Sequence, residues 1–172
     1  MELTGKRIAV LAEAQFEDLE LWYPVLRMQE AGATVTIVGT GTADTFRGKH
    51  GVPVLVDEDA EEVSANDFDA IIIPGGYAPD KLRRYQAVLD LVRTMYQQGK
   101  VVAFICHAGW VPVSAGIARG QRVTSAASIK DDMVNAGAQW EDSAVVIDGK
   151  MISSRGPSDL PAFCRAIIEV MR

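Results

Sequence analysis

The sequence VVAFICHAGW, residues 101–110, places Cys106 and His107 where an apolar run ends and a helix is expected to begin. A run of five apolar residues is typical of a buried strand in a parallel sheet. A strand that turns sharply into a helix at a cysteine presents the thiol at the sheet edge, where the helix N-terminus favours the thiolate. We therefore predict that Cys106 is a nucleophile, held in an elbow of the kind that presents nucleophilic serines. The competing interpretation is a small buried side chain, since free cysteines are commonly interior.

Strand-like and helix-like segments alternate on both sides of this stretch. Further strands are predicted at 6–11, 34–39, 70–73 and 122–125, with a hairpin within 41–56. Helices are predicted at 19–31, 81–98, 131–135 and 159–171. The Asp148-Gly149 pair predicts a tight turn between short strands at 143–147 and 150–154. Strands joined by helical crossovers form a parallel sheet covered on both faces, so we predict a single α/β domain over residues 1–172.

Composition and charge narrow the classes of function. The 172 residues carry a net charge of -6 and no cluster of Lys and Arg stands out, which argues against nucleic acid or an anionic membrane as a partner. No apolar stretch approaches the roughly 18 residues of a membrane span and no leader pattern opens the sequence, so we expect a cytoplasmic protein. Two cysteines make no disulfide framework, and with only His50 and His107 as histidines we expect no metal site.

Three polar or glycine-rich segments should meet beyond the carboxyl ends of the strands, where such sheets bind ligands. They are Phe16-Glu17-Asp18, Pro74-Gly75-Gly76 and Cys106-His107. His107 is the candidate base for Cys106, although a water-exposed histidine at a helix start is the competing interpretation. The N–H groups at Gly75 and Gly76 could bind an oxyanion, although this turn also occurs for its geometry alone. The Glu17 carboxyl could donate a hydrogen bond to a thiolate, or it could simply favour a helix N-terminus.

These segments resemble the PfpI family, a branch of the DJ superfamily. The resemblance spans nearly the whole chain in order and rests on Phe16-Glu17-Asp18-Leu19-Glu20, Gly48-Lys49-His50-Gly51, Phe68-Asp69-Ala70, Pro74-Gly75-Gly76, Ile105-Cys106-His107, Ser114-Ala115-Gly116, Ile129-Lys130-Asp131-Asp132-Met133, Asn135-Ala136-Gly137 and Ser153-Ser154-Arg155. It implies a flavodoxin-like three-layer sandwich with a mainly parallel sheet, related to the class I glutamine amidotransferases. It also implies a Glu17 carboxyl hydrogen-bonded to the Cys106 sulfur, and an oxyanion hole formed by the N–H groups of Gly76 and His107.

The resemblance also carries expectations about assembly. In peptidase-type members an acidic residue from a neighbouring subunit orients the histidine, and the matching position here is Asp80. Homodimers, and hexamers or higher assemblies built from them, are therefore implied, whereas no cofactor is. Asp80 is one methylene shorter than the Glu of many members, so a relay through Cys106, His107 and Asp80 across an interface depends on geometry.

One departure from the family pattern predicts a crowded pocket. The family usually has Gly-Pro after Cys-His, whereas this chain has Ala108-Gly109 followed by Trp110. The methyl group of Ala108 and the indole of Trp110, in a pocket that also includes Gly75, favour a small substrate over a peptide.

Three functions remain open from the sequence. The first is a cofactor-free, stress-protective enzyme of glyoxalase or deglycase type, in which Cys106 attacks a small carbonyl compound such as methylglyoxal, or its glycated adducts, and His107 or Glu17 moves protons. The second is an intracellular cysteine peptidase that uses Cys106, His107 and Asp80. The third is a redox sensor or chaperone whose Cys106 thiol oxidises to sulfinic acid. A glutamine amidotransferase is excluded because its triad needs a histidine late in the chain, and none follows His107.

Overall fold

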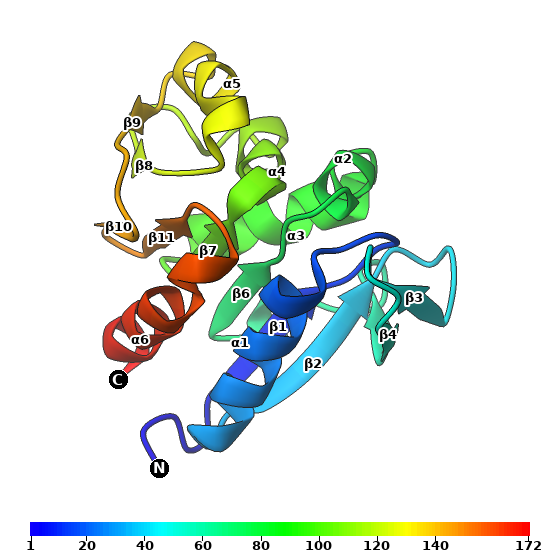
Figure 1. Ribbon diagram of the computed structural model, residues 1–172. Helices are drawn as coiled ribbons and strands as arrows, with labels where there is room; N and C mark the ends of the chain where they lie inside the picture. Colours follow the sequence, from blue (N-terminus) through cyan, green and yellow to red (C-terminus); the bar gives the residue numbers. More distant parts are fainter.

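A seven-stranded sheet organises the chain, and the computed structural model describes all residues from 1 to 172 (Figure 1). In their order across the sheet, the strands are β10 (Val146–Asp148), β11 (Met151–Ser154), β7 (Val101–Ile105), β6 (Ala70–Ile73), β1 (Arg7–Leu11), β2 (Thr34–Gly39) and β5 (Glu58–Asp59). Every neighbouring pair is parallel except β10 and β11. The predicted α/β fold with a mainly parallel sheet is therefore confirmed.

Helices cover both faces of the sheet, which gives the three layers of a flavodoxin-like sandwich. The helices α1 (Asp18–Glu30) and α6 (Leu160–Met171) pack side by side on one face, and α3 (Gln86–Gln97) covers β6 and β7 on the other (Figure 1). The remaining elements are α2 (Ala78–Leu82), α4 (Trp110–Ser114), α5 (Lys130–Asn135), β3 (Thr45–Arg47), β4 (Pro53–Leu55), β8 (Arg122–Val123) and β9 (Gln139–Trp140), with four short 3-10 turns between them. Because α2 follows β6 and α4 follows β7, these helices lie beyond the carboxyl ends of the central strands.

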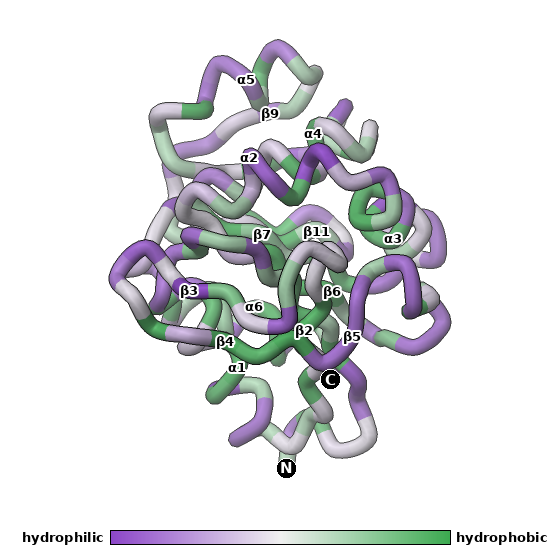
Figure 2. The backbone as a smooth tube through the Cα atoms, turned by 90° about the vertical axis from the view of Figure 1, so that its right-hand side faces the viewer, coloured by the Kyte–Doolittle hydropathy of each residue, from purple (hydrophilic) through white to green (hydrophobic).

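The central strands are apolar along their whole length because both of their faces are covered. All four residues of β6 and all five of β7 are buried, and Figure 2 shows both segments coloured as hydrophobic. Each fully buried Val, Leu, Ile or Phe side chain contributes roughly 1.5–3 kcal/mol relative to exposure, so this core holds the strand ends at fixed positions. No helix is both long and apolar enough to cross a membrane.

Three local predictions need correction. The helix expected at 81–98 is two helices, α2 and α3, because the backbone becomes extended at Tyr85, with φ of -101° and ψ of 117°. The side chain of Arg83, at the end of α2, donates to Ser114 Oγ at 2.8 Å and lies over the Trp110 ring. The strand expected at 122–125 ends at Val123, because the next N–H group bonds to a serine hydroxyl instead of a strand partner. The tight turn after β10 begins at Gly149 rather than Asp148, since Asp148 still pairs with Met151.

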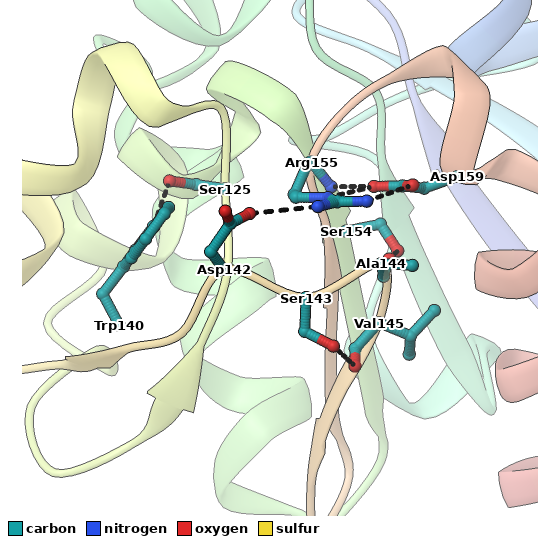
Figure 3. Close-up of polar contacts among 9 residues, drawn as sticks. All are labelled: Ser125, Trp140, Asp142, Ser143, Ala144, Val145, Ser154, Arg155 and Asp159. Atoms are coloured by element: carbon teal, nitrogen blue, oxygen red, sulfur yellow. Dashed lines mark hydrogen bonds and ion pairs between the residues drawn. The ribbon is translucent and has the colours of Figure 1, made fainter.

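The Ser153-Ser154-Arg155 motif has a structural role that the sequence does not reveal. Arg155 donates to both carboxylate oxygens of Asp159, at 2.9 and 3.0 Å, and to Asp142 at 3.0 Å (Figure 3). These hydrogen bonds hold the pKa of Asp159 below its ordinary value. Ser154 Oγ donates to the Ala144 carbonyl at 2.6 Å. The motif therefore ties the segment before β10 to the start of α6.

Candidate active site

Cys106 lies at the sharp turn between β7 and α4 in a left-handed backbone conformation. Its φ angle is +63°, a region that costs a non-glycine residue about 1–3 kcal/mol. The Cys106 carbonyl accepts the Ala126 N–H at 3.2 Å, and a 3-10 turn over Cys106–Gly109 leads directly into α4. The strained elbow expected from the sequence is present, because the buried strand on one side and the packed turn on the other fix the backbone.

The carboxyl group beside the sulfur belongs to Glu20, and the assignment of Glu17 to this contact is wrong. Glu17 caps α1, since its Oε2 accepts the Glu20 N–H at 3.0 Å, and its Oε1 lies 3.8 Å from His50 Nε2. Glu20 is fully buried, accepts the Gly75 N–H at 2.9 Å through Oε1, and lies beside Cys106, whose pKa is raised by burial and then by the charge of Glu20. Side chains in a helix lean toward its N-terminus. Glu20, the third residue of α1, therefore reaches the sulfur, whereas Glu17 caps the helix.

Glu20 and Cys106 compete for negative charge. Burial, with the nearby charge of Glu17, raises the pKa of Glu20 to about 8. Burial, with the charge of Glu20, raises the pKa of Cys106 to about 11, against the lowering effect of the N–H groups of His107 and Gly76. Loss of hydration thus opposes the resting thiolate that the sequence predicts, and it raises the pKa of the thiol despite the N–H groups of the turn. With a pKa of about 8, Glu20 keeps its proton at pH 7.

His107 is oriented by contacts at both ring nitrogens. Its Nδ1 lies 3.2 Å from Cys106 Sγ, and its Nε2 lies 3.0 Å from Ser128 Oγ. A neutral imidazole protonates one nitrogen only, so a hydroxyl that accepts from Nε2–H leaves the Nδ1 lone pair facing the thiol. Burial, and then the charge of Lys49, lower the pKa of His107, which keeps the ring neutral and able to accept a proton.

The Pro74-Gly75-Gly76 turn approaches the elbow so closely that neither glycine can carry a side chain. A Cβ on Gly75 would lie 2.4 Å from Glu20 Oε1 and 2.8 Å from the Cβ of Cys106. Gly76, with φ of +81°, forms an isolated bridge with Phe16, and its N–H group points at the sulfur. The N–H groups of Gly76 and His107 thus both act on the Cys106 sulfur, and the oxyanion hole expected from them stays a prediction.

A cavity of about 490 Å³ opens above this cluster. Cys106 and His107 lie in it, together with Gln15, Gly76, Tyr77 and Trp110. Trp110 contacts the His107 ring edge-on at a centroid separation of 5.4 Å, and its Nε1 donates to Asp132 at 2.8 Å. Ala108 is fully buried and does not line the cavity, so it supports the turn from behind instead of narrowing the opening.

Asp80 lines the same cavity but does not contact His107 within the chain. Its carboxylate accepts a hydrogen bond from Arg84 at 2.6 Å along the exposed side of α2. Within the chain, the hydrogen-bond partner of His107 on the side away from Cys106 is therefore the Ser128 hydroxyl. An acidic partner for His107 would have to come from another subunit. No group of three or more His, Cys, Asp or Glu side chains is placed to hold a metal ion.

Comparisons with known proteins identify the family of the chain. A sequence model of the DJ-1/PfpI family matches residues 6–170. The chain belongs to the DJ-1/PfpI family. Among its relatives, a deglycase of Pyrococcus abyssi is 43% identical over 96% of this chain and 99% of its own length, and a protein/nucleic acid deglycase of Escherichia coli is 37% identical over 97% and 98%.

The solved structures show the same DJ-1/PfpI fold. A protein of Anabaena variabilis with a DJ-1/ThiJ/PfpI-like and a ferritin-like domain is 39% identical with a TM-score of 0.94, covering 95% of this chain and 47% of that longer one. The match to the DJ-1/PfpI-like part of a two-domain protein confirms the flavodoxin-like sandwich.

Two residues beside Cys106 and His107 were missed by sequence reasoning. Glu20 stands within the quoted motif Phe16 to Glu20, and its position one helical turn after the cap was the signal that could have identified it. Ser128 carried no local signal, because its contact with His107 joins two turns 21 residues apart.

Proposed function

We propose that this protein is a cysteine-dependent hydrolase or lyase that converts small 2-oxoaldehydes to 2-hydroxy acids or removes their adducts from amines. The observation that carries the proposal is the Cys106–His107 contact of 3.2 Å at a cavity of about 490 Å³, with the buried Glu20 carboxyl beside the sulfur. The names of the relatives, which include deglycases, support the same class of reaction.

In the first step, the Cys106 sulfur forms a bond to the aldehyde carbon as His107 Nδ1 accepts the thiol proton. The carbonyl oxygen gains negative charge between the N–H groups of Gly76 and His107, and then takes a proton to give a hemithioacetal. Glu20 is protonated at neutral pH, so its O–H group can donate to the sulfur once the thiol proton has left.

In the second step, a proton moves from the former aldehyde carbon to the base and then to the neighbouring carbon. This transfer converts the hemithioacetal through an enediol into a thioester of the 2-hydroxy acid. Water then hydrolyses the thioester, releasing the 2-hydroxy acid and restoring the thiol. The sum is one 2-oxoaldehyde plus one water giving one 2-hydroxy acid, so this chain's side chains suffice for the chemistry.

The test is formation of lactate from methylglyoxal, and release of free amine from a methylglyoxal–lysine adduct, by the purified protein. We expect Cys106→Ala to abolish both activities. Cys164→Ala is the matched control, because Cys164 is buried in α6 and lines no part of the cavity. Equal turnover by wild type and Cys106→Ala would remove the proposal.

A peptidase is the second candidate, and the position of Asp80 at the cavity favours it. Asp80 is half exposed beside Cys106 and His107, so an oligomer could present it to the imidazole of a neighbouring copy. Under this alternative, a size-fractionated oligomer cleaves an unfolded protein substrate, and Asp80→Ala abolishes cleavage. Cleavage that survives in Asp80→Ala contradicts a relay through this carboxylate.

A further inference from the structure

Two lysines line the cavity and neither has an ionic partner within the chain. Lys49 and Lys81 are both part of the cavity lining, and neither ammonium group forms a hydrogen bond or ion pair. The acidic group in the same lining, Asp80, is already neutralised by Arg84 at 2.6 Å. The cavity is therefore locally positive in a protein whose net charge is -6.

The backbone of Lys49 is fixed in place by contacts with the start of α1. Its N–H donates to the Phe16 carbonyl at 2.9 Å, and the Asp18 carboxylate accepts from the N–H groups of His50 and Val52, each at 2.9 Å. Gly48 leaves room for this carboxylate, since a Cβ there would lie 2.3 Å from Asp18 Oδ1. The loop that carries Lys49 is thus held rigidly beside the reacting groups.

The charge of Lys49 also acts on the reacting groups. Burial raises the pKa of Cys106 and of Glu20, and the charge of Lys49 opposes that rise. At His107, burial lowers the pKa and the charge of Lys49 lowers it further. Lys81 belongs to α2, the helix that follows the Gly75-Gly76 turn, so the two lysines reach the cavity from separate elements. An anionic group of a bound molecule would meet two ammonium groups that are otherwise compensated only by water.

We propose that the cavity selects carbonyl substrates that carry a carboxylate or phosphate group, which Lys49 and Lys81 bind while the aldehyde faces Cys106. This inference rests on the proposed function and adds a substrate class to it. Lys49 and Lys81 are specificity residues in this scheme, and the chemistry at the aldehyde carbon is unchanged.

The experiment compares two 2-oxoaldehydes of equal length, 4,5-dioxopentanoate and 2-oxopentanal, which differ by a carboxylate in place of a terminal methyl group. We expect kcat/KM at low salt to favour 4,5-dioxopentanoate by about tenfold, as for one charge-assisted contact at a partly exposed site. The preference should shrink at high salt, since exposed charges are screened.

Substitution assigns the preference to the two lysines. In Lys49→Gln and in Lys81→Gln, the ratio of the two kcat/KM values should fall at least threefold. Lys6→Gln changes the same charge just before the start of β1, at the other end of the strands from the cavity, and should keep the wild-type ratio.

The outcomes separate the two claims. Turnover of neither compound would remove the proposed function itself. Turnover of 2-oxopentanal at least as fast as of 4,5-dioxopentanoate would overturn the anion preference and leave the carbonyl chemistry standing. A preference that persists in both lysine variants would also overturn the inference.

Discussion

The substitution Glu20→Gln should stabilise the fold in a pH-dependent manner. Glu20 titrates near 4.5 when hydrated and near 8 in the folded chain, so the folded state keeps a proton that the unfolded state loses across this range. A raised pKa means that stability is greatest below pH 4.5 and declines as the pH rises to about 8. At about 1.4 kcal/mol per pH unit, the loss is about 3 kcal/mol at pH 7 and about 5 kcal/mol above pH 8.

Glutamine has the same shape, cannot ionise, and retains an oxygen for the Gly75 N–H. Urea unfolding at pH 4.5 and at pH 8.5 should therefore show nearly equal free energies of unfolding at the lower pH. At the higher pH, the Glu20→Gln variant should be more stable by several kcal/mol. Glu169→Gln on the exposed side of α6 is the control and should match wild type at both pH values. A Glu20→Gln effect that is equal at both pH values would refute the reasoning.

Three further predictions concern the elbow and its supports. The free energy of unfolding in urea should be about 1 kcal/mol higher for Cys106→Gly than for Cys106→Ala, because only glycine adopts a φ of +63° without strain; equal free energies would contradict a strained turn. Ser128→Ala should lower kcat for methylglyoxal about threefold to tenfold and shift its pH profile, with Ser128→Thr restoring both; an unchanged profile would show that the hydroxyl does not orient His107. Gly75→Ala should reduce turnover more than about a hundredfold, because its Cβ would displace Glu20 and Cys106, and a variant near wild-type activity would disprove that packing.

The strands and the nucleophile could be predicted because their signals are local. Val101–Ile105 is apolar at every position, and the cysteine that ends it precedes a helix-forming segment. Local preference failed where a tertiary contact changed the outcome. The backbone becomes extended at Tyr85, next to the Arg83 side chain that bonds to Ser114, and it divides a helix that the pattern alone would continue to Gln98.

The chemical state of the site could not be predicted from local sequence. A helix N-terminus favours a thiolate, but the net effect depends on how much water the sulfur and its neighbours lose, which only the fold determines. Local sequence also cannot decide between Glu17 and Glu20, because they stand one helical turn apart and the fold determines which carboxyl reaches the sulfur. The burial of Glu20 against the Gly75 turn raises its pKa, and its contact with Cys106 makes it, rather than Glu17, the acid beside the sulfur.

The pH dependence of Cys106 alkylation by iodoacetamide, followed by peptide mass in wild type and in Glu20→Gln, tests the coupling of sulfur and carboxyl most directly. We expect the wild-type rate to keep rising well above pH 9, since the pKa of Cys106 is about 11, and we expect the midpoint in Glu20→Gln to fall by at least one pH unit because the opposing charge is gone. A wild-type midpoint below pH 7, or a midpoint that Glu20→Gln leaves in place, would contradict a buried thiol held protonated beside this carboxyl.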